Sequence, residues 1–190
     1  VGAPGFPAGF SVEQYEEATQ HSIDSQYGFL SATVSNGAPE DTPEAVEARM
    51  RETNDYWKAH SDRYVQVYSL ADIERARAEG KLAVMHNFQS MMPLGEDLAN
   101  GRKFYDLGLR QMDFTYNIDC VYASGGVSNG DGTDGGVTEF GAEVVREMNR
   151  LGIVVDASHS SNQTAIDMAR LSRKPVMLSH SNVAAFQPIG

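Results

Sequence analysis

The stretch VVDASHSSNQTAIDMARLSRKPVMLSH (residues 154–180) places the same Ser-His pair at the end of two consecutive apolar runs. The first run ends in Ser158-His159, the second ends in Ser179-His180, and the segment between them has the composition of a helix. Short apolar strands that alternate with helices are typical of a parallel sheet that is covered on both faces. We therefore predict two neighbouring parallel strands of an α/β fold, with a histidine at the carboxyl end of each.

The same alternation extends upstream through most of the sequence. The chain has 190 residues, whereas a closed eight-stranded α/β barrel takes about 250. We expect a single domain over residues 1–190 that is part of such a barrel or an open sheet. Strands are predicted at 29–35, 64–69, 81–88, 109–116, 153–158 and 175–180, and helices within 11–30 and at 42–60, 70–80, 95–108, 139–151 and 161–172.

The composition indicates a soluble globular protein. Hydrophobic residues make up 41% of the chain, and no segment approaches the ~18 consecutive apolar residues that a membrane helix requires. The formal net charge of −11 argues against nucleic acid and anionic membranes as partners. The only cysteine, Cys120, excludes an internal disulfide and a thiolate-rich metal site. The start of the chain does not have the pattern of a signal peptide, and the compartment stays open between bacterial cytoplasm and periplasm.

Four consecutive predicted strands end in residues that can carry chemistry: Gln89, Tyr116, His159 and His180. Active-site residues of parallel α/β proteins gather at the carboxyl ends of the strands, and neighbouring strands lie about 4.8 Å apart, so these side chains can converge. Two neutral imidazoles at one point suit zinc or a similar divalent metal. A histidine at a strand end is also commonly a hydrogen-bonded structural residue, and the spacing alone does not decide between the two interpretations.

Other polar residues near these strand ends are assigned structural roles. Asp156 lies three residues before His159 and should face away from it, unless the strand has already ended. His86 is on the face opposite Gln89 and should be a packing or surface residue. The Gly/Asp/Asn-rich segment 123–136 lacks the lysine and the helix position of a phosphate-binding loop, so a flexible active-site loop is the simpler interpretation.

The segment FGAEVVREMNRLGIVVDASHSSNQTAIDMARLSRKPVMLSHSN (140–182) closely resembles the part of membrane (renal) dipeptidases, the M19 family of zinc peptidases, that carries two metal-binding histidines. Upstream, LADIERARAEGKLAVMHNFQSMMPLGEDL (70–98) resembles a helix–strand segment of the family, and LGLRQMDFTYN (107–117) its next strand. The DGGVTEFG entry to the following helix (134–141) also fits. The resemblance is dense from about residue 70 to 182.

The resemblance implies an incomplete central portion of a (β/α)₈ TIM-type barrel of the metallo-dependent hydrolases, which hold one or two Zn²⁺ ions. The family hydrolyses dipeptides, including some with a D-residue on the C-terminal side, through a metal-bound hydroxide. His159 and His180 match the two histidines that hold the second metal. Dimers are common in the family, so a homodimer is possible.

The sequence departs from the family pattern in three places. Gln89 stands where the family has a glutamate that bridges both metals, and a neutral amide cannot replace that carboxylate. Tyr116 stands where the family has a substrate-binding histidine, and a tyrosine can still donate a hydrogen bond to an oxyanion. The His-x-Asp pair of the first strand and a late catalytic aspartate are expected outside these 190 residues.

Two functional hypotheses follow. The first is a zinc-dependent dipeptidase-like hydrolase with an altered metal site at Gln89. The alternative is a barrel that has lost peptidase chemistry and serves as a binding or scaffold protein, or as a biosynthetic tailoring enzyme. Gln89 is the feature that favours the alternative, and the paired histidines are the feature that favours the enzyme.

Overall fold

The computed structural model describes residues 11–127 and 133–181. The chain forms two compact units, Val1–Gln111 and Met112–Gly190. Along the chain the elements are α1 (Val12–Asp24), β1 (Phe29–Ser35), α2 (Pro43–Ala59), β2 (Tyr64–Gln66), α3 (Leu70–Glu79), β3 (Leu82–Phe88), the short 3₁₀ helix η2 (Met92–Leu94), α4 (Ala99–Asp106), β4 (Leu109–Asp113), α5 (Glu139–Leu151), β5 (Val154–Asp156) and α6 (Asn162–Leu171).

The sheet of the first unit is parallel and is organised around β3. Phe29 of β1 is paired with Ala83, and Tyr64 of β2 is paired with Leu82. The first residues of β4 also belong to this unit, and β4 is next to β3 in the sheet. Six of the seven residues of β3 are buried, which explains its nearly continuous apolar sequence, since helices cover both faces of such a strand.

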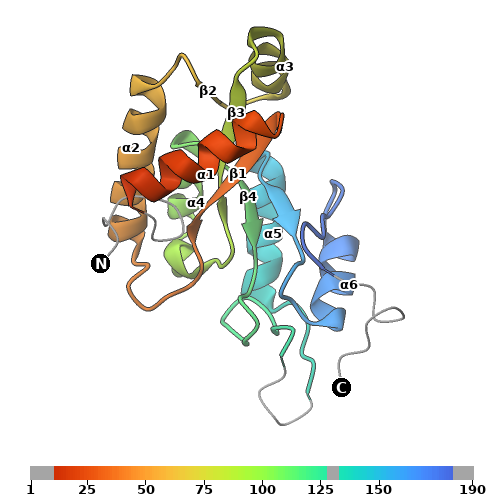
Figure 1. Ribbon diagram of the computed structural model, residues 1–190. Coiled ribbons are helices and arrows are strands. Elements are labelled where there is room, and N and C mark those ends of the chain that lie inside the picture. The colour runs from red at the N-terminus through yellow and green to blue at the C-terminus, as the bar shows by residue number, and fades with distance from the viewer. Residues whose placement is uncertain (1–10, 128–132, 182–190) are drawn as a thin grey trace. The chain divides into compact units, whose positions relative to one another are not determined.

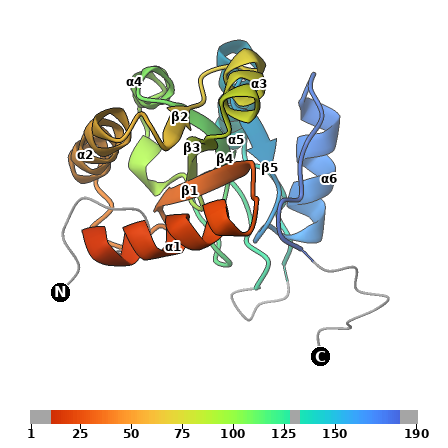
Figure 2. The ribbon, with the colours of Figure 1, turned by 45° about the horizontal axis from the view of Figure 1, so that its top comes forward.

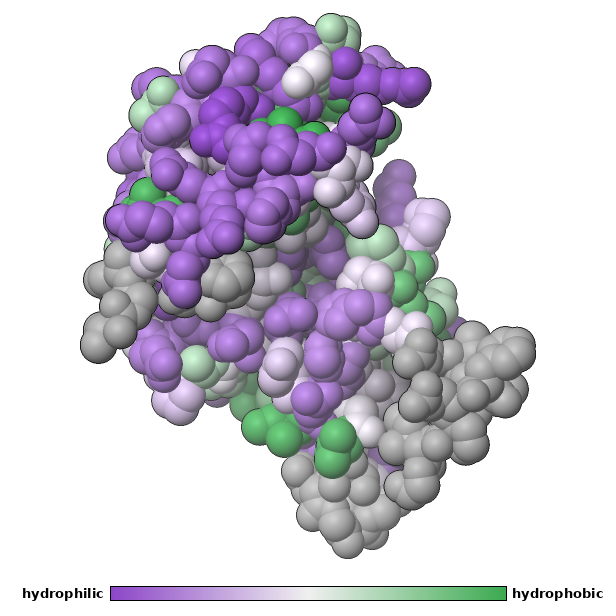
Figure 3. Space-filling view, viewed as in Figure 1, coloured by the Kyte–Doolittle hydropathy of each residue, from purple (hydrophilic) through white to green (hydrophobic). Residues whose placement is uncertain are grey.

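The helices α1 and α2 contribute to an aromatic core on this sheet. In both ribbon views α1 lies along β1 (Figures 1 and 2). The indole Nε1 of Trp57 in α2 donates to the hydroxyl of Tyr15 in α1, at 2.8 Å, so that the polar atoms of two buried aromatic residues satisfy each other. The core combines Tyr15, Ala32, Trp57, Tyr64, Leu82 and Val84. On the outside, the helices of the first unit are largely hydrophilic (Figure 3).

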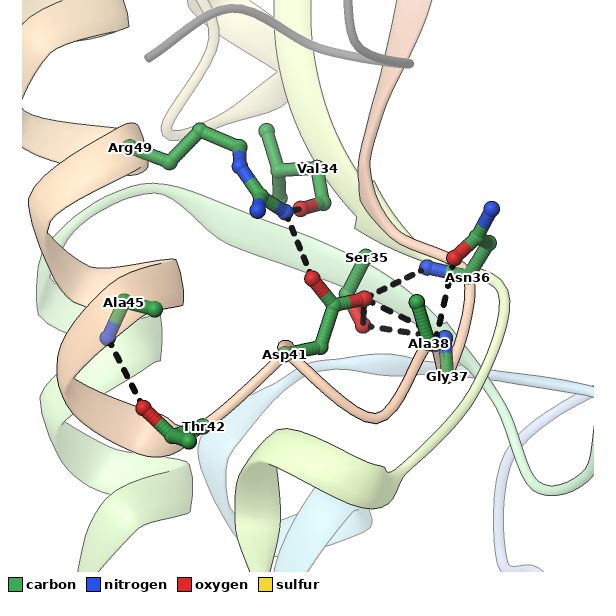
Figure 4. Close-up of polar contacts among 9 residues, drawn as sticks. All are labelled: Val34, Ser35, Asn36, Gly37, Ala38, Asp41, Thr42, Ala45 and Arg49. Atoms are coloured by element: carbon green, nitrogen blue, oxygen red, sulfur yellow. Dashed lines mark hydrogen bonds and ion pairs between the residues drawn. The ribbon is translucent and has the colours of Figure 1, made fainter. Parts of the chain in front are cut away.

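A buried ion pair orders the loop that follows β1. Asp41, which is 5% exposed, pairs through Oδ1 with the guanidinium of Arg49 in α2 at 2.8 Å (Figure 4). Its Oδ2 accepts hydrogen bonds from the Ser35 hydroxyl and from the backbone N–H groups of Asn36 and Gly37. Because the donors come from the end of β1, from the loop and from α2, this carboxylate fixes how the chain turns from strand to helix.

The second unit contains the end of β4, then α5, β5 and α6. Thr138 and Ser161 cap the two helices with their hydroxyl oxygens, and α5 ends at Gly152 in the left-handed conformation. The last residue of β5, Asp156, forms a parallel bridge with Met177. Gly141 in the first turn of α5 lies so close to the carbonyl oxygen of Tyr122 that a Cβ there would be 2.1 Å from it.

The predicted parallel α/β fold is confirmed, but four strands are clearly shorter than predicted: β2 ends at Gln66, and β5 covers Val154–Asp156 only. β4 ends at Asp113, three residues before Tyr116, and the segment 175–180 contributes a single bridge at Met177. Beyond these residues both segments form hydrogen bonds between side chains and backbone. The Thr115 hydroxyl donates to the carbonyl oxygen of His159, and the Ser179 N–H donates to the side chain of Asp156. Among the described residues, no helix is long and apolar enough to cross a membrane.

Candidate metal centre

Three ring side chains of the second unit form a row, each three residues beyond the last sheet-paired residue of its segment. Tyr116 follows Asp113, His159 follows Asp156 and His180 follows Met177 by the same interval. The ring centroids of Tyr116 and His159 are 4.5 Å apart, and those of His159 and His180 are 4.7 Å apart. The two imidazoles face each other with their Nε2 atoms 2.8 Å apart. The structure thus brings together three of the four residues that the sequence singled out.

His159 is held in one orientation by its neighbours. Its Nδ1 lies 2.8 Å from Oδ1 of Asn117, and because an amide oxygen only accepts, Nδ1 must carry the hydrogen. Its carbonyl oxygen accepts from the Thr115 hydroxyl at 2.9 Å and from the N–H of Gly126 at 2.7 Å. These contacts stabilise an unusual left-handed backbone at His159, with φ of 60°. The Nε2 lone pair is therefore the one directed at His180.

His180 is positioned by the two serines that precede the histidines. Its Nδ1 lies 2.7 Å from the Ser179 hydroxyl, and its backbone N–H donates to the Ser158 hydroxyl at 3.2 Å. A serine hydroxyl can either donate or accept, so it matches His180 in either tautomer. The Nε2 of His180 can therefore donate to His159, or both Nε2 lone pairs can be directed at one cation.

The repeated serines also hold the segments that carry the histidines together through a buried carboxylate. Oδ1 of Asp156 accepts from the backbone N–H and the hydroxyl of Ser158 at 2.9 and 2.7 Å, and from the N–H of Ser179 at 3.3 Å. Burial alone would raise the pKa of Asp156, but the hydrogen bonds from Ser179 and Ser158 outweigh it and hold the pKa below its usual value. Asp156 is thus a structural anchor for the two segments that carry the histidines, and β5 ends at this residue, so strand periodicity does not extend to His159.

The surroundings of His159 favour the neutral imidazole. Burial lowers the pKa of His159, the neighbouring His180 lowers it further, and the charge of Asp156 opposes them in part. A neutral imidazole with a free Nε2 lone pair is the form that binds metal ions.

Asp113, the last residue of β4, is the one residue of this cluster that the sequence analysis missed. It is 1% exposed, and neither of its carboxylate oxygens has a hydrogen-bond donor among the described residues. Ligand atoms of Asp113, His159 and His180 all lie within 4.8 Å of one another. Burial raises the pKa of Asp113 to about 9, and the charge of the nearby Asp156 and a side-chain hydrogen bond from protonated Asp113 to that carboxylate act in the same direction. The available signal was an acidic residue between the apolar Met112 and Phe114 in a predicted strand.

Glycines let the loop after β4 approach the histidine. A Cβ at Gly125 would lie 2.3 Å from the carbonyl oxygen of Asn117, and a Cβ at Gly126 would lie 3.0 Å from that of His159. Close packing, rather than flexibility, therefore accounts for these two glycines of the segment 123–136. Its residues 128–132 lie outside the part of the chain that the structure describes.

The remaining predicted residues lie in the first unit. Gln89 directly follows β3, and its N–H donates to the carbonyl oxygen of Ser35 at 2.8 Å. His86 is fully buried, stacks on Trp57 with a centroid distance of 4.6 Å, and its Nε2 contacts Oδ1 of Asn54 at 2.8 Å. The predicted packing role of His86 is confirmed.

A parallel α/β fold with facing histidines beyond the carboxyl ends of its strands is typical of metal-dependent hydrolases. The model of the membrane dipeptidase family (peptidase family M19) matches residues 14–189, and the chain belongs to this family.

Known proteins similar to this chain agree with that assignment. An uncharacterized dipeptidase of Schizosaccharomyces pombe is 36% identical over 107 residues, which are 56% of this chain and 26% of the relative. The crystal structure of an amidohydrolase from Pseudomonas aeruginosa matches with a TM-score of 0.84 and 27% identity over 92% of this chain and 51% of that protein. The probable dipeptidase PvdM from the same organism matches with a TM-score of 0.68 and 28% identity over 75% of this chain and 37% of that protein. The chain thus spans about half or less of the length of these relatives.

Proposed function

We propose that the protein is a zinc-dependent hydrolase that cleaves the amide bond of a dipeptide, with His159 and His180 as ligands of the metal. The observation that carries this proposal is the 2.8 Å approach of the two Nε2 atoms, together with the Asn117 contact that fixes the tautomer of His159. Membership of the dipeptidase family, and relatives that are named dipeptidases, support the substrate class.

The residues of the site would divide the work. A zinc ion held by His159 and His180 would supply Lewis acidity and would lower the pKa of a bound water. Asn117 keeps the hydrogen of His159 on Nδ1, and the Ser179 hydroxyl can accept the corresponding hydrogen from His180, so both Nε2 lone pairs are available. The side chain of Tyr116, stacked beside His159 and 40% exposed, can donate a hydrogen bond to the oxyanion that develops on the substrate.

The simplest test of the zinc assignment is the metal content of the natural full-length protein. We expect zinc in the purified protein, and we expect His159→Ala to remove most of it. The matched control is His21→Ala, which makes the same substitution at an exposed position of α1. Undiminished zinc in the His159 variant would refute the assignment of this histidine.

We also propose that the metal site differs from that of the family at Gln89. An amide offers one neutral carbonyl oxygen, so it cannot neutralise two cations, and one ion would be held well and a second poorly. This residue is also what favours the alternative of a barrel that serves in binding or as a tailoring enzyme. Gln89→Glu separates the two cases: a large gain in bound metal and dipeptide hydrolysis would indicate a degraded site, whereas a loss of activity would indicate a working variant.

The organisation of the whole protein follows as a further part of this proposal. The family match extends across both compact units, which supports one barrel domain over residues 1–190. A homodimer is the expected assembly, and light scattering of the natural full-length protein would test it.

A further inference from the structure

We propose that Asp113 is a third protein ligand of the ion held by His159 and His180, so that one divalent cation is bound by two histidines and one carboxylate. This inference rests on the proposed function. It adds a ligand to the residues that the sequence analysis considered for the metal site, which are His159, His180 and Gln89. It also provides the site with a negative charge of its own.

The burial of Asp113 is the first argument. A buried carboxylate ordinarily accepts several hydrogen bonds or forms an ion pair, because leaving it without either is costly. Asp113 is 1% exposed, and among the described residues neither oxygen has a donor and no lysine or arginine pairs with it. A cation bound at this point would compensate the charge of the carboxylate.

The contrast with Asp156 strengthens the argument. Both aspartates are the last residues of their strands, and both are almost completely buried. Asp156 receives hydrogen bonds from Ser158 and Ser179, as a structural carboxylate should. Asp113 receives none from the described residues and instead has ligand atoms of both histidines within 4.8 Å. The two residues therefore have different roles, although they occupy equivalent positions in the fold.

The distances suit one ion after small side-chain rotations. Bonds of about 2.0–2.2 Å from zinc to nitrogen and oxygen place the ligand atoms of a tetrahedral site about 3.4 Å apart. The two Nε2 atoms are now 2.8 Å apart, and the ligand atoms of the group are separated by at most 4.8 Å. A small opening between the histidines and a small approach of Asp113 would complete three corners and leave the fourth for water or substrate.

The ligand set has a chemical consequence for the altered site. Two imidazoles alone leave the full charge of a divalent cation uncompensated, and Gln89 contributes no charge. Asp113 would supply the missing carboxylate from β4, next to the strand that carries His159. Two nitrogens and one oxygen with an open position form a set that suits zinc and also accepts other first-row divalent metals.

The test compares variants of the natural full-length protein by zinc affinity, measured in competition with a chromogenic chelator. Asp113→Asn keeps the shape of the side chain and removes its charge. We expect zinc to bind at least about 100-fold more weakly, a larger loss than is typical when a residue that only hydrogen-bonds to a metal ligand is replaced. Asp55→Asn, the same change at an exposed position of α2, should leave the affinity unchanged. An Asp113→Asn protein that binds zinc within threefold of the wild type overturns the inference.

A second variant tests proximity directly and does not depend on the first. In Asp113→Cys loaded with Co²⁺, we expect a thiolate-to-cobalt charge-transfer band that the wild type lacks, because only a coordinated sulfur produces it. A spectrum without this band overturns the inference. The proposed function fails separately: it is refuted if His159→Ala retains its zinc, whereas normal zinc binding by Asp113→Asn alongside metal loss in His159→Ala refutes only the role of Asp113.

Discussion

Replacing Ser158 by alanine should weaken both the fold beneath the histidines and the binding of zinc. The Ser158 side chain is buried, its hydroxyl donates to Oδ1 of Asp156 at 2.7 Å, and the Ser158 hydroxyl oxygen accepts from the backbone N–H of His180 at 3.2 Å. The variant loses a hydrogen bond to a charged group, which contributes about 1.5–3 kcal/mol. It also leaves the N–H of His180 without this acceptor.

The expected magnitude follows from what remains around Asp156. Two backbone N–H groups, those of Ser158 and Ser179, still donate to its Oδ1, so the carboxylate is not left without partners. We therefore expect the free energy of unfolding to fall by about 2 kcal/mol, near the middle of the range for one such bond. The position of His180 depends on the hydrogen bond from its N–H to the Ser158 hydroxyl. Zinc affinity should therefore fall by about 10–100-fold, as is typical when a residue that hydrogen-bonds to a metal ligand is replaced.

Two measurements separate the effects. Urea unfolding in the presence of a chelator gives the stability of the metal-free protein, and chelator competition gives the zinc affinity. Ser172→Ala is the matched control, because the Ser172 hydroxyl donates to the carbonyl oxygen of Lys174 at 2.7 Å, away from the histidines. This control should lose some stability and no zinc affinity. If Ser158→Ala binds zinc as tightly as the control does, the serine network does not position the ligands.

Three further predictions follow from the structure. Burial lowers the pKa of His86 from 6.5 to about 3, so below pH 6.5 the unfolded chain binds a proton at this residue that the folded protein does not bind. The free energy of unfolding should therefore fall with acidity by up to about 1.4 kcal/mol per pH unit. Urea unfolding between pH 6.5 and 5 should show this slope in the wild type and not in His86→Gln. Asn117→Ala removes the acceptor for Nδ1 of His159 and should lower zinc affinity about 10-fold, whereas Asn117→Asp should retain it; equal affinities would contradict the tautomer assignment. Gly141→Ala places a Cβ 2.1 Å from the Tyr122 carbonyl oxygen and should cost at least about 2 kcal/mol in thermal unfolding, whereas Gly28→Ala, with no atom within 4 Å of its Cβ, should cost far less.

The sequence predicted those features that depend on neighbours along the chain. The bounds of β1 and α5 and the end of β3 all follow from local periodicity. The approach of His159 and His180 was also expected, because both were predicted at the carboxyl ends of neighbouring parallel strands. In each case the evidence lay within one segment or in the spacing of two.

The features that escaped prediction depend on contacts between distant segments. The interpretation of 109–116 as one continuous strand hid Asp113, because an acidic residue in a strand can be exposed or buried according to what covers it. The loop that orients His159 could not be derived either, since Asn117 reaches it across 42 positions of sequence. Nothing in the local sequence indicates that Gly126 and Thr115 would share the carbonyl oxygen of His159.

The two interpretations of the Ser-His pairs, as structural residues or as metal ligands, are not exclusive once the atoms are considered. An imidazole has two ring nitrogens, and in both histidines Nδ1 contacts an oxygen while Nε2 is directed at the other ring. The structural bond at Nδ1 is what makes Nε2 suitable as a ligand, because it fixes the ring and raises the basicity of the opposite nitrogen. The serines act one step further out: they join the two segments through Asp156 and so set the distance between the histidines. Asp113 on the neighbouring strand β4 accepts no hydrogen bond from the described residues, and it is the carboxylate that we propose for the metal.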